Sequence, residues 1–254
     1  KSSDYTKLKG IDPLTLVRDL QSHGICILGS SIIGLEEHTP DNIAQVIEDA
    51  IEYDSEFHQF MLYTPFPGTP LGAEHKSRGT MLDSTEVNEA DVHGQLRFNF
   101  HHPHIKNGQE TQFLLNAFQR DFDVNGPSVL RLARTRLADW KRYKNSTDSR
   151  IRARYRRESR SLGTTYAGAL WAAKKWFPNN SVLQTKFDVV LRELHGEFGL
   201  TSRILTPIVG RYIYSCVRSE DRRLRAGWRY EPPTFYESNH HDGHLTPMGI
   251  LARR

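Results

Sequence analysis

Cysteine is scarce in this sequence. The chain of 254 residues has only two cysteines, Cys26 and Cys216, and they lie far apart. Such a pair cannot hold an iron–sulfur cluster or a four-cysteine zinc site, because both need several cysteines close together. Two distant thiols also fit a reduced, cytoplasmic protein better than a disulfide framework. We therefore expect a cytoplasmic chain that binds no metal by itself.

Long hydrophobic runs and a leader sequence are also lacking. The run IVGRYIYSCV, residues 208–217, is broken by charge well short of the ~18 residues that a membrane span needs. The first residues, KSSDYTKLKG, contain no Met, no apolar signal core and no cleavage signature. We expect no transmembrane segment, and we expect the sequence to be a fragment entered mid-protein.

Charge is not scarce, but it is unevenly distributed. The net charge is +4, whereas residues 131–160 carry twelve Lys or Arg against Asp139, Asp148 and Glu158, a local net charge of +9. A solvated helical surface or a contact with an acidic neighbouring domain explains such a run, and so does binding to nucleic acid, phosphates or anionic lipid heads. The alternating arginines of residues 150–157, together with Tyr155, place cations all around the expected helix.

The first third of the chain alternates helical and strand patterns. IDPLTLVRDLQSHG predicts a helix with Asp12 as N-cap and Pro13 at its first position, and TPDNIAQVIEDAIEYD predicts another with Thr39 as N-cap. An apolar run comes after each of these helices, at residues 25–33 and 57–63, and we expect each run to be a strand covered on both faces. The order helix, strand, helix, strand predicts the βα units of a parallel sheet.

Beyond Leu71 the pattern changes to helices. One more strand is expected at residues 95–100. Helical periodicity, interrupted by Gly, Pro or Asn, then predicts helices at 109–122, 127–143, 146–160, 163–177, 180–197 and 201–217. The four tryptophans are expected to be core anchors. The broken pattern at the end predicts a mobile tail.

The loops after the two strands are candidates for a binding site, because ligands of parallel sheets bind beyond the carboxyl ends of the strands. In GSSIIGLEEHT, Gly34 lets the backbone approach a planar ligand. In YTPFPGTPL, the prolines at 65, 67 and 70 fix the backbone and leave their carbonyls exposed. Packing of a strand end and an ordinary structural corner are the alternative explanations.

Together these loops resemble the fifth and sixth strands of the radical S-adenosylmethionine (SAM) enzymes, most closely the cobalamin-binding branch. Ile32, Gly34 and Glu37 match the last part of the family's Gly-x-Ile-x-Gly-x-x-Glu pattern, while Gly29 stands one residue too early. The turn Thr64–Thr69 matches the family's Thr-Pro-x-Pro-Gly-Thr pattern. The resemblance covers about residues 10–75. The family's Cys-x-x-x-Cys-x-x-Cys loop has no counterpart in this sequence.

The resemblance implies a site and a fold. Ile32 and Gly34 would support the SAM adenine, the backbone of Tyr63, Thr64 and Pro65 would meet its edge, and Glu37 would orient the loop. The fold would be α/β: residues 1–100 would be the C-terminal βα units of a partial TIM-type barrel, residues 101–235 a helical domain, and residues 236–254 the tail. No catalytic residue is assigned.

The implied function is that of a fragment of a radical SAM enzyme whose leading reaction is methyl transfer to carbon. SAM would be the cofactor, and the [4Fe-4S] cluster and cobalamin would come from the missing barrel half and cobalamin domain. The substrate would be a small or lipid-like molecule. The alternative is a non-catalytic α/β module whose basic helical arm binds RNA or an anionic partner. Histidines at 38, 58, 101, 102 and 104, with Glu36 and Glu37, offer metal-ligand types, but no metal site is predicted.

Overall fold

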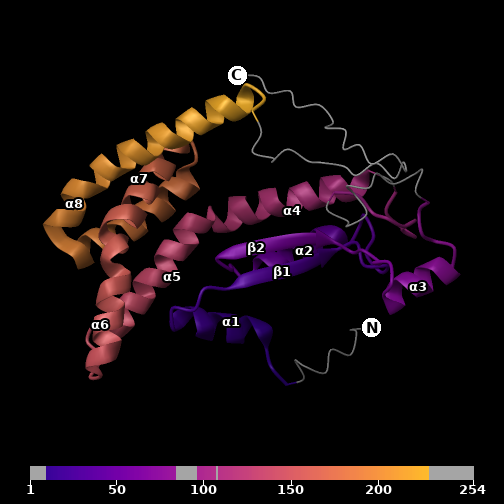
Figure 1. Cartoon of the computed structure of the whole chain (residues 1–254), viewed down its shortest axis with the longest axis horizontal. Helices are drawn as coiled ribbons and strands as arrows, with labels where there is room; N and C mark the ends of the chain where they lie inside the picture. Colours follow the sequence, from indigo (N-terminus) through magenta and orange to yellow (C-terminus); the bar gives the residue numbers. More distant parts are fainter. Residues whose placement is uncertain (1–9, 84–95, 107, 229–254) are drawn as a thin grey trace, which may run out of the picture.

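The computed structural model describes residues 10–83, 96–106 and 108–228. The described chain is an α/β protein with a helical C-terminal region (Figure 1). Its first elements are α1 (Pro13–Ser22), β1 (Leu28–Ile33), α2 (Ile43–Ile51), β2 (Phe57–Leu62) and α3 (Pro70–Ser77). Helices follow: α4 (Gln109–Asn125), α5 (Ser128–Tyr143), α6 (Ser149–Glu158), the 3-10 turn η3 (Ser159–Ser161), the π turn η4 (Leu162–Tyr166), α7 (Ala167–Trp176) and α8 (Ser181–Arg225). The predicted tail lies outside the described residues.

Local capping explains why α1 begins where the sequence predicts. The side chain of Asp12 accepts hydrogen bonds from the backbone N–H groups of Leu14 and Thr15, and Pro13 occupies the first helical position. The second helix begins later than predicted, at Ile43. Thr39 and Asn42 nevertheless exchange side-chain to backbone hydrogen bonds in the manner of a capping box, so they order the turn that leads into α2.

The two strands pair in parallel, as predicted. Their register runs from Leu28 opposite Phe57 to Ile33 opposite Leu62. No further strand joins them within the described residues, where the sheet has two strands. The strand expected at residues 95–100 is wrong for the described residues 96–100: only Phe100 forms a β-bridge, with Met81, because aromatic side chains of this segment pack into the core instead.

The sheet is covered on one face rather than on both. Ile33, Phe60 and Leu62 are buried against α2 and α4, in a core that also contains Phe98 and Phe100. Alternate side chains point the other way and are exposed at Leu28 (63%), Ile32 (42%), Phe57 (45%) and Met61 (38%). The expectation of strands covered on both faces is therefore wrong for the described chain, and the apolar residues of the second face lie against no other element.

The helical region has its own core, formed by α5, η4, α7 and the first half of α8. The helices predicted at 180–197 and 201–217 are both present. They follow each other within α8 and meet at a kink at Gly199, which leaves the helical conformation with φ +64°. Within the described residues, no helix is long and apolar enough to cross a membrane.

A buried polar junction joins the helical region to the amino ends of the strands. Arg131 of α5 forms a bidentate ion pair with Asp121 of α4, at 2.9 and 3.1 Å, and donates to the carbonyl of Ser55 at 2.7 Å. Glu56 is fully buried and accepts hydrogen bonds from Thr135 of α5 and from the N–H of Ile27, the latter at 2.6 Å. These contacts fix α4 and α5 against the base of the sheet.

Candidate functional site

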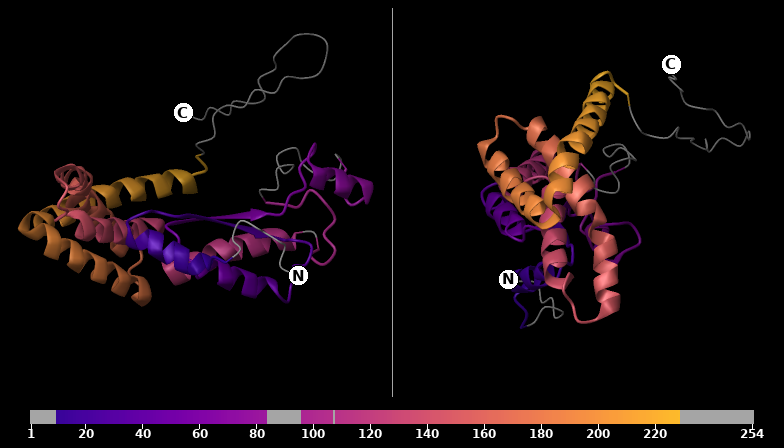
Figure 2. Two further views of the ribbon diagram at one scale, coloured as in Figure 1. Left: turned by 90° about the horizontal axis from the view of Figure 1, so that it is seen from below. Right: turned by 90° about the vertical axis from the view of Figure 1, so that its left-hand side faces the viewer.

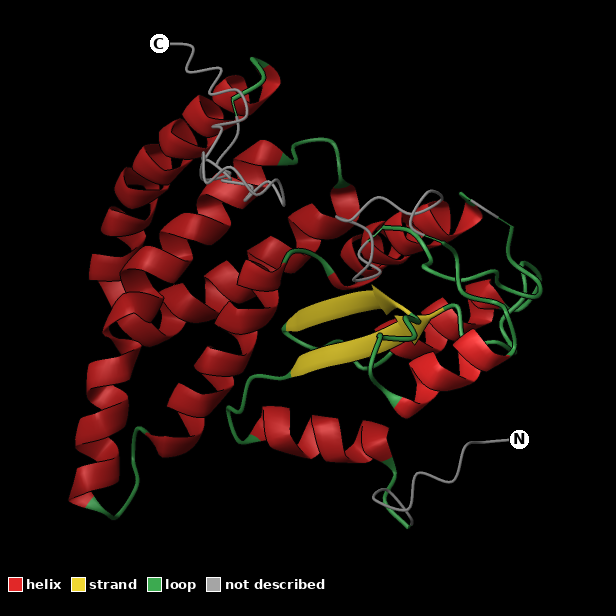
Figure 3. Cartoon of the chain, turned by 45° about the vertical axis from the view of Figure 1, so that its right-hand side comes forward, coloured by secondary structure: helices red, strands yellow, loops and turns green. Residues whose placement is uncertain are grey.

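The carboxyl ends of β1 and β2 lie side by side (Figure 3). The N–H of Tyr63 donates to the carbonyl of Ile33 at 2.8 Å, which extends the pairing beyond β2. At the next position of the first strand, Gly34 has φ +84°, in the left-handed region that favours glycine. The loops 34–38 and 63–69 therefore leave the sheet at adjacent points, at the edge where parallel sheets bind ligands.

His38 closes the first of these loops. Its ring is buried, and Nδ1 accepts hydrogen bonds from the backbone N–H groups of Gly34, at 3.0 Å, and Leu35, at 3.2 Å. Accepting two N–H groups requires a lone pair on Nδ1, so the neutral ring carries its proton on Nε2. Burial lowers the pKa of His38 below its ordinary value. This histidine builds the loop in its neutral form.

The proline-rich turn builds the start of α3, an element that the sequence analysis missed. Thr69 is its N-cap and accepts from the N–H of Gly72 at 3.1 Å, and Pro70 is at the first helical position. Pro65 is buried, and its carbonyl accepts from the amide of Asn99 at 3.0 Å. The expectation that the proline carbonyls are exposed is thus wrong at Pro65, because a segment distant in sequence covers it.

An ion pair bridges the loop after β1 and the end of α3. Arg78 Nη2 donates to Glu36 Oε1 at 2.6 Å and to His75 Nε2 at 3.1 Å. His75 is fully buried, and its Nδ1 donates to Thr80 Oγ1 at 2.9 Å. Arg78 lowers the pKa of Glu36. Glu36 therefore ties the loop after β1 to the end of α3, and the orienting role expected of Glu37 stays a prediction.

Aromatic rings from residues 98–102 complete the edge. A Cβ at Gly34 would overlap the ring of Phe98, so this glycine is needed for packing. The ring of Phe98 stacks on His102 with centroids 5.1 Å apart. His102 Nε2 donates to the carbonyl of Leu35 at 3.0 Å, while its Nδ1 accepts from the N–H of Ile105 at 2.9 Å. The sequence analysis did not identify Phe98, because a phenylalanine in an irregular segment gives no signal of its place.

The six predicted binding residues all lie at this edge, but in different environments: Ile32, Gly34, Glu37, Tyr63, Thr64 and Pro65. Ile32 is exposed on the open face of the sheet, and Glu37 is exposed in the loop. Tyr63 is half-buried, with its ring 5.6 Å from that of Phe100. Thr64 Oγ1 donates to the carbonyl of Leu62 at 2.9 Å. Ile32 therefore offers the most accessible apolar side chain of the six.

His38 and His102 of this edge hold backbone groups, and His75 contacts the side chains of Thr80 and Arg78. In the described part of the chain, no group of three or more His, Cys, Asp or Glu side chains is placed to hold a metal ion. Both cysteines are free thiols; Cys26 is half-buried, and Cys216 is exposed on α8. Burial raises the pKa of the Cys26 thiol.

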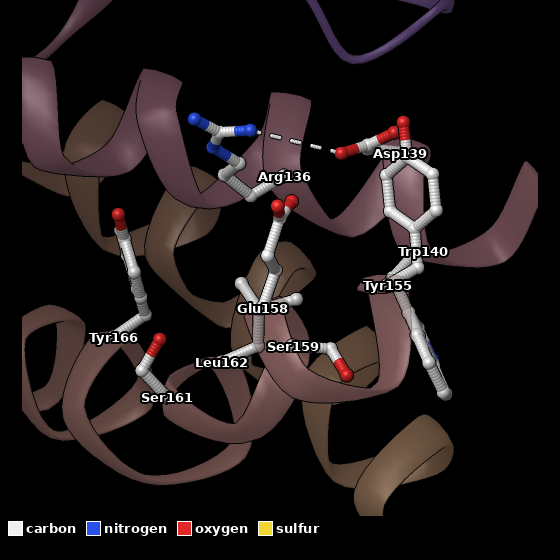
Figure 4. Close-up of a pocket in the computed structure, with 9 residues that line it drawn as sticks. All are labelled: Arg136, Asp139, Trp140, Tyr155, Glu158, Ser159, Ser161, Leu162 and Tyr166. Atoms are coloured by element: carbon white, nitrogen blue, oxygen red, sulfur yellow. Dashed lines mark ion pairs between the residues drawn. The ribbon is translucent and has the colours of Figure 1, made fainter. Parts of the chain in front are cut away.

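A separate cavity of about 240 Å³ lies between α5, α6 and η4 (Figure 4). Asp139 Oδ2 is 3.7 Å from Arg136 Nη1 in its wall, and burial raises the pKa of Asp139. The buried Oδ1 accepts no hydrogen bond and lies beneath Gly24, where a Cβ would overlap it. Gly24 precedes β1, so this cavity is at the opposite end of the strand from the candidate site, and its orphaned oxygen faces the backbone.

Three of the arginines of α6 make contacts within the chain, while Arg156 and Arg157 are exposed. Arg152 donates to the backbone carbonyls of Ser146 and Thr147. Arg150 pairs with Asp148, and Arg154 pairs with Glu158. The basic arm expected for RNA is thus partly committed to contacts within the chain, and RNA binding stays a prediction.

Acid should weaken the fold through the buried histidines of the candidate site. Burial is the largest cause of a lowered pKa at His38, His75 and His102. Because the unfolded chain binds protons more tightly, their contribution to stability is complete above the unfolded value of about 6.5 and is lost as the pH falls below it. We expect the urea midpoint to be level from pH 8 to 7 and to fall below about pH 6.5.

A control for this acid effect is His101→Gln, at an exposed neighbouring position. This variant should keep the acid dependence of the urea midpoint, whereas His75→Gln should make it shallower. A midpoint that stays level down to about pH 5.5 would contradict the assignment of neutral, buried rings.

The chain is similar to an uncharacterized methyltransferase of Pyrococcus horikoshii. The two are 36% identical over 66 residues, which make up 25% of this chain and 14% of that protein. The similarity therefore spans about one seventh of the length of the relative. No known protein family matches the chain, and no solved structure matches it. This chain is thus methyltransferase-like over a quarter of its length.

Proposed function

We propose that this chain forms part of the SAM pocket and the substrate wall of a radical SAM methyltransferase of the cobalamin-dependent branch. The observation that carries the proposal is the similarity to a methyltransferase, which indicates an enzyme of methyl transfer. The radical and cobalamin-dependent character rests on the resemblance of the strand-end loops. The other barrel strands, the cluster loop and the cobalamin domain belong to a longer parent protein.

The open face of the sheet supports the presence of further strands in the parent protein. Leu28 and Ile32 of β1 and Phe57 and Met61 of β2 expose apolar side chains on the face opposite α2 and α4. In a (β/α) barrel this is the inward face, which a closed ring of strands covers. The described α/β part then corresponds to two neighbouring barrel strands with the helix that connects them.

At the strand ends, an adenine fits on one side only, beside Ile32 and not above Gly34. Ile32 presents an exposed aliphatic surface, whereas Phe98 fills the space above Gly34. An adenine would therefore lie on the side of Ile32, with the backbone of Thr64 at its edge. When bound, SAM supplies the activated methyl group, and the part of this chain is to bind and orient it. Cys26 and Cys216 do not fit a [4Fe-4S] cluster, so we assign no ligand of that cluster to this chain.

The test is SAM binding by the parent protein, produced by extending the coding sequence upstream of Lys1. We expect SAM to protect the loops 34–38 and 63–69 from hydrogen exchange. Ile32→Glu should weaken SAM binding by at least about tenfold, because it places a charge against the apolar adenine contact. Binding is measured by calorimetric titration.

The matched control is Leu28→Glu, on the same face of β1 but at its amino end. It should leave the affinity for SAM within about twofold of the wild type. Equal losses in the two variants, absence of protection, or an upstream sequence without a Cys-x-x-x-Cys-x-x-Cys motif would each overturn part of the proposal. The last outcome would leave methyl transfer but remove the radical chemistry.

A further inference from the structure

In the second half of α8, after Gly199, small side chains face the protein and large apolar side chains face outward. Its inward face is made of small residues: Ser202 and Thr206 are each 1% exposed, and Gly210 packs directly on Trp171 of α7. Its large apolar residues point outward instead. They form the α8 stripe: Leu200 (70% exposed), Ile204 (54%), Ile208 (56%) and Tyr212 (73%).

The spacing makes the α8 stripe one continuous surface. Its members recur every four residues, so they lie one above the other along the helix. Soluble helices normally turn such residues toward the core, and a contiguous apolar patch marks a site of association. Figure 2 shows the last turns of α8 extending past the other helices, beyond the end of the stripe. The stripe itself is accessible because its four side chains are 54–73% exposed.

The part of α8 that carries the stripe has charges of a single sign, and the first carboxylates beyond it, Glu220 and Asp221, pair with Arg223 and Arg225. Residues 198–219 contain no Asp or Glu, but they contain Arg203, Arg211 and Arg218, all exposed. Arg211 follows Ile208 by three residues and therefore lies beside the α8 stripe, with its guanidinium carbon 5.8 Å from the ring centroid of Trp171. The partner should thus combine an apolar layer with dense negative charge.

We propose that the α8 stripe docks on an anionic lipid surface. Leu200, Ile204 and Ile208 enter the boundary between headgroups and acyl chains, and the arginines contact lipid phosphates. Tyr212 has the amphipathic ring that is enriched at this boundary. The helix lies along the surface and does not cross it, in keeping with the interrupted apolar sequence of α8.

A second copy of the chain fits this surface less well. An isologous contact through the α8 stripe would bring Arg211 and Arg218 of both copies into one interface. Residues 198–219 offer no carboxylate to compensate them, and Glu220 and Asp221 beyond this stretch already pair with Arg223 and Arg225. The two arginine rows would repel each other, whereas an anionic lipid surface attracts both.

The test is flotation of this chain with vesicles of phosphatidylglycerol mixed with phosphatidylcholine, compared with vesicles of phosphatidylcholine alone. We expect binding to the anionic vesicles only, weakened by salt. The variant Leu200→Ser/Ile204→Ser/Ile208→Ser should bind at least about tenfold more weakly, because it removes most of the inserted apolar area. These side chains are exposed, so helical circular dichroism should be retained.

The control is Val182→Ser/Val189→Ser, which removes two exposed aliphatic side chains from the first half of the same helix. It should bind as the wild type does. Arg203→Gln/Arg218→Gln should reduce both the affinity and its dependence on salt. Equal binding to both kinds of vesicle, no binding, or equal losses in the stripe and control variants would overturn the proposal. A dimer in solution that the stripe variant dissociates would do so too, by assigning the surface to a second copy.

Discussion

Arg131→Met should lower the free energy of unfolding by about 3–5 kcal/mol, the largest loss expected for a single side chain in this protein. Arg131 is 3% exposed and pairs with Asp121, which is 5% exposed. Its removal leaves a buried carboxylate without its cation and the carbonyl of Ser55 without a donor. Methionine fills similar space, so the loss reports on the charge and the hydrogen bonds rather than on a cavity.

Arg120→Met is the matched control, because Arg120 also pairs with a carboxylate, that of Glu48 at 2.6 Å. Both side chains of this second pair are close to half exposed, so water replaces the lost contact and the urea midpoint should hardly change. The double variant Arg131→Met/Asp121→Leu should recover part of the loss, since it leaves no isolated charge. Similar losses for Arg131→Met and Arg120→Met would show that the junction is solvated.

Gly34→Ala should destabilise the chain by about 2–4 kcal/mol, from two separate causes. The left-handed backbone at Gly34 costs a residue with a Cβ about 1–2 kcal/mol, and the new methyl group would overlap the ring of Phe98. A comparison with Gly68→Ala separates the backbone cost from the overlap. It has nearly the same φ, +79°, but a Cβ there would meet nothing within 4 Å.

Gly68→Ala should therefore show the backbone cost alone, and the difference between the two alanine variants measures the overlap with Phe98. Adding Phe98→Leu to Gly34→Ala should restore part of the stability, because the smaller side chain makes room for the methyl group. The two alanine variants would be equally stable if Phe98 were not held against Gly34. The free energies come from urea unfolding.

Elements with local signals could be predicted from the sequence, and contacts between distant segments could not. The Asp12–Pro13 start of α1 and the apolar runs of the strands each act within a few residues, and the structure has these elements where the sequence places them. The start of α3 uses the same local signals, Thr69 followed by Pro70, within the proline-rich turn. These signals would have been sufficient to predict this helix.

The candidate site contains contacts between distant segments that the sequence does not predict. The strand-end loops are recognisable because glycine and proline mark them, but their packing depends on Phe98, Asn99 and His102. These residues belong to an irregular segment that is distant in sequence: Asn99 lies 34 residues after Pro65, and His102 lies 67 residues after Leu35. Glu36 and Glu37 are adjacent carboxylates, and the family pattern singles out Glu37, whereas the contact with the end of α3 is made by Glu36. The position of Arg78 at the end of α3 decides this contact.

The separation of the two ends of the sheet has a consequence for how this protein can change. The junction of Arg131, Asp121 and Glu56 anchors the amino ends of the strands, while the loops after Ile33 and Leu62 leave from the carboxyl ends. Mutations at exposed loop positions such as Glu37 leave this anchor intact, whereas Gly34 is held by its packing on Phe98. Evolution, or a laboratory selection confined to exposed loop positions, can therefore change ligand binding while the junction that anchors the strands stays the same.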